Sequence, residues 1–201
     1  MLRLEDDWVW DSWIADDGER YHLFFLKAPR ALGDPGLRHR RAVIGHASSM
    51  DLVDWRIEPD ALHPLPGSWD DLALWTGSVV RGEDGVWRLY YTALGTRGHE
   101  TRDQRIGLAE SDDLMEWRRV GDRPIAAVDP RWYKTLEEDE TVSETWRDPF
   151  VFQDDDGGGG WHMLITARRL GAPRNADGVL AHGRSSDMRS WEIGPPLTVP
   201  A

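Results

Sequence analysis

The sequence contains no cysteine among its 201 residues. A disulfide framework, a thiolate metal site and cysteine catalysis are therefore excluded. The chain also has no apolar run as long as a membrane-spanning helix, and residues 1–7 lack the basic and apolar regions of a secretory signal. We therefore expect a cytoplasmic protein without a membrane partner.

Basic residues are in short supply. The chain has 24 Lys and Arg against 36 Asp and Glu, a net charge of −12, and its pI is about 4.9. Proteins that hold a phosphate backbone need clustered positive charge, so nucleic acid is not expected as a partner. The histidines are scattered and no loop has calcium-loop spacing. The sequence therefore predicts neither a metal site nor another cofactor.

Tryptophan, by contrast, is abundant, with 12 residues. Its ring fills protein cores, and it also stacks on cations and sugar rings. This abundance is compatible with a carbohydrate site, and equally with a repeat that places one tryptophan in each unit.

Three segments share one pattern, a short apolar strand followed by Ser-x-Asp and then by Trp: residues 44–55, 106–117 and 180–191. Two further apolar runs, joined by an acidic turn with glycine, precede each of them. Each unit thus predicts four antiparallel strands, which is typical of a propeller blade. We therefore predict an all-β fold, a β-propeller of four-stranded antiparallel blades. The chain would form one partial domain over residues 1–201, with blades at about residues 8–58, 74–120 and 146–195.

The innermost strand opens each unit, and its first residues face the central channel where propellers bind ligands. This equivalent position is occupied by Asp11 in the first unit, by Thr76-Gly77-Ser78 in the second and by Asp148 in the third. Arg147 stands beside Asp148, and such charged pairs next to aromatic residues are costly to bury without a purpose. From the residues alone, a structural ion pair and a catalytic or sugar-binding site both remain open.

Several motifs resemble those of the five-bladed propeller glycoside hydrolases. The most specific is residues 45–55, which is similar to the family signature Gly-His-Ala-x-Ser-x-Asp-Leu-x-x-Trp. Residues 10–13, 76–80 and 146–149 resemble further family motifs, the last of them Arg-Asp-Pro. The similarity is greatest to the family 32 fructosidases, such as invertase, inulinase and levanase, and families 43 and 68 share the fold. Residues 11–13 read Asp-Ser-Trp where family 32 usually has Asp-Pro-Asn, a form that looks more like family 68.

The resemblance implies roles for individual residues. Asp11 would be the nucleophile, and Asp148 would bind sugar hydroxyls and stabilise the transition state. The acid/base glutamate of the family lies in a fourth blade, after the three units found here, and Glu144 is a candidate substitute although its motif position differs. The resemblance also suggests substrate-binding residues, which are Trp10, Trp13, Trp75, Ser78, Trp146 and Arg147.

We therefore expect a glycosidase, an O-glycosyl hydrolase, that acts on or binds sucrose, a fructan or another furanoside. It would be an enzyme if it is complete or complemented. The alternatives are a non-catalytic carbohydrate-binding or self-assembling propeller fragment, and an unrelated propeller with a scaffolding role. Three blades leave two open sheet faces, so we expect a homo-oligomer or a complementing chain to cover them.

Overall fold

The computed structural model describes residues 2–96, 103–136, 145–154 and 160–199. The strands form three antiparallel sheets of four. The first sheet holds β1 (Asp7–Asp16), β2 (Tyr21–Pro29), β3 (Val43–Ser49) and β4 (Arg56–Ile57); the second holds β5 (Ala73–Arg81), β6 (Trp87–Gly95), β7 (Asp103–Ser111) and β8 (Arg118–Arg119); the third holds β9 (Trp146–Gln153), β10 (Trp161–Arg168), β11 (Gly178–Ser185) and β12 (Glu192–Ile193). The prediction of an all-β fold with four-stranded antiparallel sheets is confirmed.

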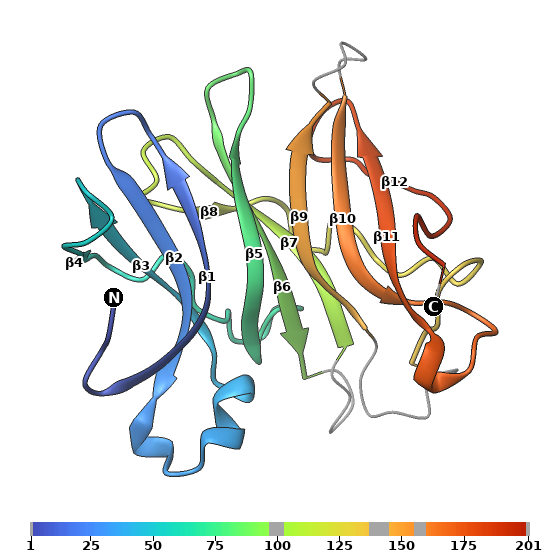
Figure 1. Ribbon diagram of the computed structural model, residues 1–201, viewed down its shortest axis with the longest axis horizontal. Helices are drawn as coiled ribbons and strands as arrows, with labels where there is room; N and C mark the ends of the chain where they lie inside the picture. Colours follow the sequence, from blue (N-terminus) through green and yellow to red (C-terminus); the bar gives the residue numbers. More distant parts are fainter. Residues whose placement is uncertain (1, 97–102, 137–144, 155–159, 200–201) are drawn as a thin grey trace.

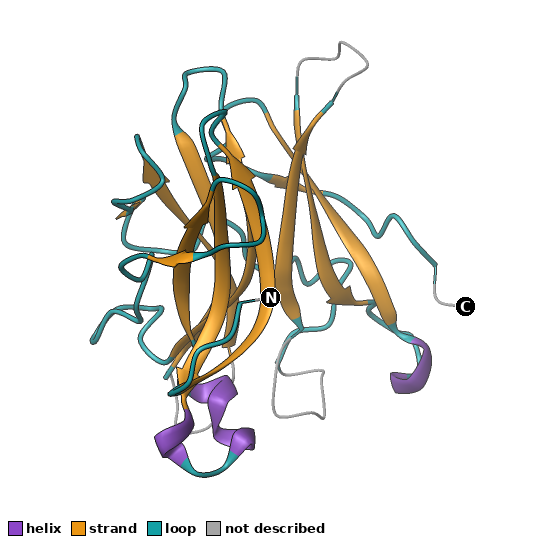
Figure 2. Ribbon diagram, turned by 60° about the vertical axis from the view of Figure 1, so that its left-hand side comes forward, coloured by secondary structure: helices purple, strands orange, loops and turns teal. Residues whose placement is uncertain are grey.

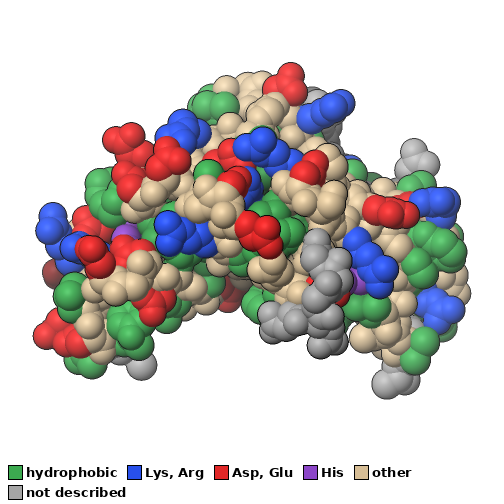
Figure 3. Space-filling view, turned by 90° about the horizontal axis from the view of Figure 1, so that it is seen from above, with side chains coloured by type: hydrophobic (Ala, Val, Ile, Leu, Met, Phe, Trp, Pro, Cys, Tyr) green, Lys and Arg blue, Asp and Glu red, His purple; other side chains and the backbone are tan. Residues whose placement is uncertain are grey.

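The three sheets stand side by side in chain order (Figure 1). Seen from above, the molecule is an arch that is hollowed on one side (Figure 3). The described helices are the short 3-10 turns η1 (Arg30–Leu32), η2 (Pro35–Arg40) and η3 (Arg174–Ala176), drawn in purple in Figure 2. None of these described helices has the length and apolar character that a membrane crossing requires.

The Ser-x-Asp motif forms the turn that leads out of the third strand of each sheet. In the third sheet the Ser185 hydroxyl accepts hydrogen bonds from two backbone amides, and the Asp187 carboxylate accepts two more from residues 189 and 190. The same pattern recurs in residues 49–54, and in residues 111–116 with one amide bonded to the Ser111 hydroxyl and two to the Asp113 carboxylate. These bonds stabilise a backbone in which the apolar residue after the aspartate is left-handed; φ is 64° at Leu52, 63° at Leu114 and 62° at Met188.

Each of the last two turns inserts its left-handed residue against the preceding sheet. Leu114 is fully buried in the cluster that contains Phe24 of the first sheet, and Met188 is buried beside Tyr90 of the second. The tryptophan that ends each turn repeats the same edge contact: Trp117 meets Phe24 with ring centroids 5.6 Å apart, and Trp191 meets Tyr90 at 5.7 Å. These contacts hold one sheet on the next.

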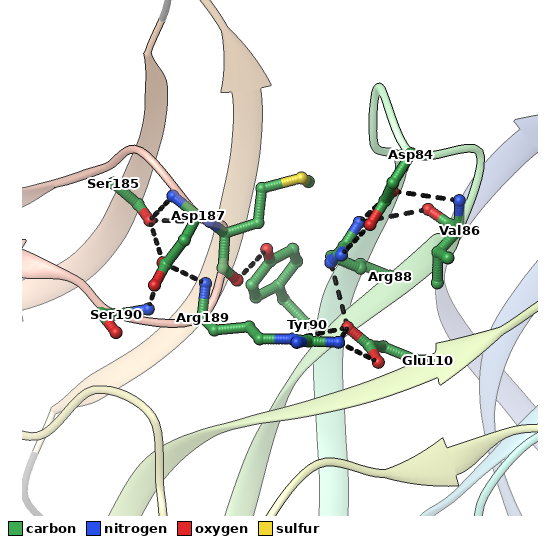
Figure 4. Close-up of polar contacts among 10 residues, drawn as sticks. Asp84, Val86, Arg88, Tyr90, Glu110, Ser185, Asp187, Arg189 and Ser190 are labelled. Carbon is green, nitrogen blue, oxygen red and sulfur yellow. Dashed lines mark hydrogen bonds and ion pairs between the residues drawn. The ribbon is translucent and has the colours of Figure 1, made fainter.

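Polar contacts complete the junction of the second and third sheets (Figure 4). The Tyr90 hydroxyl donates to the Met188 carbonyl at 2.7 Å. Arg189 reaches back across the junction and donates to both carboxylate oxygens of Glu110, each at 2.8 Å. Arg88 lies beside Glu110 and also binds Asp84 at 2.7 and 2.9 Å. Because Arg88 is nearly buried, its charge needs these two acidic partners.

The first sheet carries a buried histidine pair instead of charges. His22 Nδ1 and His46 Nε2 lie 2.9 Å apart, and the His46 ring stacks on Phe24. Burial, together with the neighbouring His22, lowers the pKa of His46 from 6.5 to about 4, while Glu58 opposes the shift. His46 is therefore neutral in the folded protein at neutral pH.

We expect this histidine to make the protein less stable in mild acid. Between pH 6.5 and about 4 the unfolded chain takes up a proton at His46 that the folded chain does not, so the free energy of unfolding falls as the pH falls. Between pH 7 and pH 4.5 the loss should be roughly 2–3 kcal/mol, measured by urea denaturation. Over the same pH change, the free energy of unfolding of His46→Gln should fall less than that of the parent, by this amount. The control His63→Gln replaces an exposed histidine and should show the pH dependence of the parent. An unchanged pH dependence in His46→Gln would contradict the assignment.

Candidate active site

The first strand of each sheet carries a bulge at the same place. The register of β1 shifts between Trp10 and Ser12, and that of β5 shifts between Trp75 and Gly77. In the third sheet the register against β9 shifts between Leu164 and Thr166. The extra residues are thus Asp11 in the first sheet, Thr76 in the second and the Asp148-Pro149 pair in the third. Bulges re-aim side chains, and here Asp11, Thr76 and Asp148 all line the same cavity.

The two aspartates at these bulges have unusual backbones. Asp11 has a φ of 32° and Asp148 a φ of 58°, in the left-handed region that residues other than glycine seldom adopt. Such conformations cost free energy and gather at functional sites. Gly77, next to Thr76, is required for steric reasons, because a Cβ there would overlap the Tyr90 carbonyl oxygen.

The bulges open onto one cavity of about 490 Å³. Residues of β1, β5, β9 and η2 line it, so it joins all three sheets. Five of the predicted site residues meet there, together with four others. The lining consists of Trp10, Asp11, Leu26, Arg38, His39, Trp75, Thr76, Arg147 and Asp148.

One wall of the cavity is aromatic and cationic. The Arg38 guanidinium lies over the Trp10 ring, 5.3 Å from its centroid, and the His39 ring meets both Trp10 and Trp75 edge-on. The Trp75 indole N–H donates to the His39 carbonyl at 2.7 Å, which fixes η2 against β5. Such a wall can stack on a sugar ring, because the C–H face of a sugar is apolar.

The cavity lining also includes two carboxylates, those of Asp11 and Asp148. Asp11 Oδ2 accepts a hydrogen bond from the Thr76 hydroxyl at 2.6 Å. Asp148 Oδ2 lies 3.3 Å from Arg147 Nε. Burial raises the pKa of Asp148, the Arg147 charge opposes this, and the nearby Asp11 charge raises it further. The charge of Asp11 therefore acts on Asp148 within the cavity.

A buried threonine ties the second sheet to the third at the site. The Thr92 hydroxyl on β6 donates to the Thr76 carbonyl at 3.0 Å and accepts from the Asp148 amide at 2.8 Å. Thr92 itself is fully buried, which fixes its hydroxyl between these two backbone groups. This hydroxyl holds the Asp148 backbone at a fixed distance from Thr76.

Three residues that we predicted to bind substrate do not line the cavity. Trp146 is fully buried in the core, where its ring packs on Tyr133, because its side chain points between the sheets and not into the hollow. Trp13 packs on Phe24, and the Ser78 hydroxyl accepts from the Val151 amide at 3.2 Å in the junction of the second and third sheets. In the described structure these three side chains thus make packing and junction contacts and do not line the cavity. Glu144 lies outside the described residues.

Arg38, His39 and Thr92 were not among the predicted site residues. Only the fold brings η2, which carries Arg38 and His39, back to β1 and β5. A weak signal existed for Thr92, since Thr166 stands at the matching position of the next unit and bonds the Asp148 carboxylate. Among the described residues, no group of three or more His, Asp or Glu side chains is placed to hold a metal ion.

Comparison with known proteins places these features in a family context. Residues 13–199 match the N-terminal domain of glycosyl hydrolases family 32. Among curated relatives, raffinose invertase of Escherichia coli is 32% identical over 87% of this chain and 32% of its own length. Sucrose-6-phosphate hydrolase of Bacillus subtilis is 28% identical, and the match covers 89% of this chain and 32% of the relative. Fructan 6-exohydrolase of Beta vulgaris is 27% identical, and the match covers 88% of this chain and 27% of the relative. The chain thus spans about a third of these relatives.

Solved structures superpose on nearly the whole chain. Inulosucrase from Halalkalicoccus jeotgali bound to kestose has a TM-score of 0.78 and 26% identity, and the match covers 96% of this chain and 54% of that one. Fructan 1-exohydrolase IIa from Cichorium intybus has a TM-score of 0.77 and 22% identity, and the match covers 99% and 34%. These superpositions confirm the predicted propeller architecture.

We expect the charge of Asp11 to influence the pKa of Asp148. Removing the Asp11 charge with Asp11→Asn should lower the pKa of Asp148, because that charge is one of the causes that raise it. NMR titration of the side-chain carboxyl carbon of Asp148 measures the change directly. Glu19→Gln, in the exposed turn between β1 and β2, is the control and should leave the titration unchanged. An Asp148 pKa that does not move in Asp11→Asn would refute the coupling.

Replacing Thr92 should loosen the site. Thr92→Val keeps the shape but removes the hydrogen-bond partner of the Thr76 carbonyl and of the Asp148 amide, which should lower the free energy of unfolding by about 1–3 kcal/mol. Hydrogen exchange of the Asp148 amide should also become faster. Thr92→Ser keeps the hydroxyl and should retain the slow exchange of the parent. Equal exchange rates in the Val and Ser variants would show that the hydroxyl is not the tether.

Proposed function

This chain belongs to glycosyl hydrolase family 32, and on that premise we propose that its cavity binds the fructosyl unit of a fructoside. Asp11 acts as the nucleophile, and Asp148 with Arg147 holds the sugar hydroxyls. The observation that carries the proposal is the meeting of Asp11 and Asp148, from the first and third sheets, in one cavity with an aromatic wall. The names of the relatives support a fructosyl ligand, since they include invertase, fructan exohydrolase and inulosucrase bound to kestose.

The chemistry of the proposal starts with the Asp11 carboxylate. It attacks the anomeric carbon of the fructosyl ring, the bond to the leaving oxygen breaks, and a covalent fructosyl-enzyme ester forms. The Thr76 hydroxyl orients Asp11 by its 2.6 Å hydrogen bond. Water then attacks the ester and releases fructose, which restores the carboxylate.

Positive charge develops on the sugar ring in the transition state of this reaction. The Asp148 carboxylate lies beside the same cavity and can accept hydrogen bonds from ring hydroxyls that shorten as the charge grows. Arg147 lies 3.3 Å from that carboxylate, so it favours the ionised form against the effect of burial. Protonation of Asp148 would remove this assistance.

The leaving oxygen of an ordinary fructoside needs a proton from a general acid. Among the described residues that line the cavity, the carboxyl groups are Asp11 and Asp148, and the proposal gives both of them other tasks. The acid is therefore assigned to a group outside this set. A non-catalytic fructoside-binding module keeps the same cavity and is the second candidate, favoured by this shortage of acids at the described walls.

A substrate that needs no acid separates the two candidates. Fluoride leaves without protonation, so β-fructofuranosyl fluoride tests the nucleophile alone. We expect this chain to release fluoride faster than the buffer does, as followed with a fluoride electrode. Asp11→Asn should abolish the excess rate, whereas the control Asp16→Asn, at the far end of β1, should keep it.

Binding is measured in parallel by calorimetry with 1-kestose, and with maltose as a sugar that lacks a fructosyl unit. Arg147→Leu should weaken 1-kestose binding by roughly tenfold to a hundredfold, because it removes a charged partner of the sugar-binding carboxylate. Binding of 1-kestose without fluoride release would favour the non-catalytic module. Equal affinity for 1-kestose and maltose, or no binding of either, would overturn the proposed function.

A further inference from the structure

The third sheet has one face that nothing in the described chain covers. Every residue of β6, in the middle sheet, is buried, whereas β10 alternates between buried and half-buried residues. Phe150 is 58% exposed and Leu180 38% exposed on the uncovered side. We call this side the open face; its members are Phe150, Phe152, His162, Leu164, Leu180 and His182, which register pairing places on one side of the sheet.

The junctions inside the chain show what covers such a face. The equivalent face of the first sheet receives the turn 111–117, and that of the second receives the turn 185–191. In both, a left-handed apolar residue and a tryptophan from the turn contact the aromatic residue at the centre of the face, Phe24 or Tyr90. The residue at the centre of the open face is Leu164, by the same register.

The two internal junctions differ in their chemistry. The second sheet offers Glu110, and the turn that covers it brings Arg189. The first sheet offers the pair His22 and His46, with Ser48 in the position of Glu110. The turn that covers it brings the uncharged Met115 where the other brings arginine. A face with the acid thus receives a cationic turn, and a face with the histidine pair receives an apolar one.

The open face carries a histidine pair, like the equivalent face of the first sheet. His162 Nδ1 lies 2.7 Å from His182 Nε2, and the two rings stack as His22 and His46 do. Asp154 lies 3.4 Å from His162, in the place that Asp17 takes beside His22. Arg184 stands at the position of Glu110, so a cationic turn would be repelled. A hollow of about 770 Å³ lies beside these residues, lined in part by His162, Arg184 and Asp154.

The chain also carries a turn of the apolar kind that covers nothing in the described structure. It is residues 49–55, with Leu52 45% exposed and Val53 67% exposed. Val53 stands at the position of Met115 and Arg189. The hydrogen bonds of Ser49 and Asp51 already hold this turn in the docking conformation, with Leu52 left-handed. Little conformational entropy would be lost when it docks.

We propose that the open face of one copy of this chain binds the turn 49–55 of a second copy. Leu52 fills the place that Leu114 and Met188 fill inside the chain, Trp55 packs on Leu164, and the uncharged Val53 lies beside Arg184. The contact is head to tail, so the two partners use different surfaces: the copy that contributes its open face keeps a free turn, and the copy that contributes its turn keeps a free open face. The turn 185–191 cannot serve in its place, because Met188 and Arg189 are already engaged within their own chain.

Sedimentation velocity over a range of concentrations tests the association of the full chain at pH 7.5. We expect self-association, and we expect Leu52→Glu and Phe150→Glu each to weaken it at least tenfold. Both side chains are exposed, so the variants should melt like the parent by circular dichroism. Leu65→Glu, at an exposed leucine in neither surface, is the matched control and should associate like the parent.

A mixing experiment tests the head-to-tail geometry. Leu52→Glu retains an intact open face and Phe150→Glu retains an intact turn, so an equimolar mixture should form a one-to-one dimer although neither variant associates alone. A parent chain that remains monomeric at about 100 μM would overturn the proposal. Association that survives both substitutions, or variants that do not complement each other on mixing, would also overturn it, because these results would indicate another partner for the open face or a symmetric contact.

Discussion

The structure depends on covering the two faces of each sheet. A four-stranded sheet of this kind is apolar on both sides, and a turn with a left-handed apolar residue from the next sheet closes one of them. The serine and aspartate of that turn fix its backbone before it packs, so the junction is made by a preformed element and needs little ordering. The middle sheet, packed on both sides, has the most deeply buried strand of the chain.

The same packing determines the geometry of the candidate active site. Asp11, Thr76 and Asp148 come from three different sheets, and their relative positions follow from how each sheet sits on the next. Bulges then turn these residues toward the hollow, and the Thr92 hydroxyl ties two of the three strands together. Stability at the junctions and the arrangement of the cavity are therefore coupled. A substitution that loosens a junction should also displace a carboxylate.

Charge is distributed unevenly over the two kinds of junction. Where Glu110 is present, Arg88 and Arg189 neutralise it, and where a histidine pair takes its place, burial keeps the imidazole of His46 uncharged. In both cases the interior avoids an unpaired charge, which would cost far more than the contact contributes. In the cavity the charge of Asp148 is not fully compensated. Burial and the Asp11 charge raise the pKa of Asp148, and the Arg147 charge only partly opposes them. That imbalance is characteristic of functional sites.

The sequence alone determined the repeat, the strand pattern and the positions of Asp11, Thr76 and Asp148, because strand periodicity and turn chemistry are local properties. It also identified the family through motifs that the comparison confirms. Only the tertiary structure decided which aromatic residues reach the cavity. Trp10 and Trp75 reach it, whereas Trp146 and Trp13 fill the junctions. Successive side chains of a strand point to opposite faces of the sheet, and a bulge inserts one residue, so the side chains beyond it point to the opposite faces from those expected without the bulge. Arg38 and His39 could be placed only when η2 folded back onto β5, a contact between segments distant in the sequence.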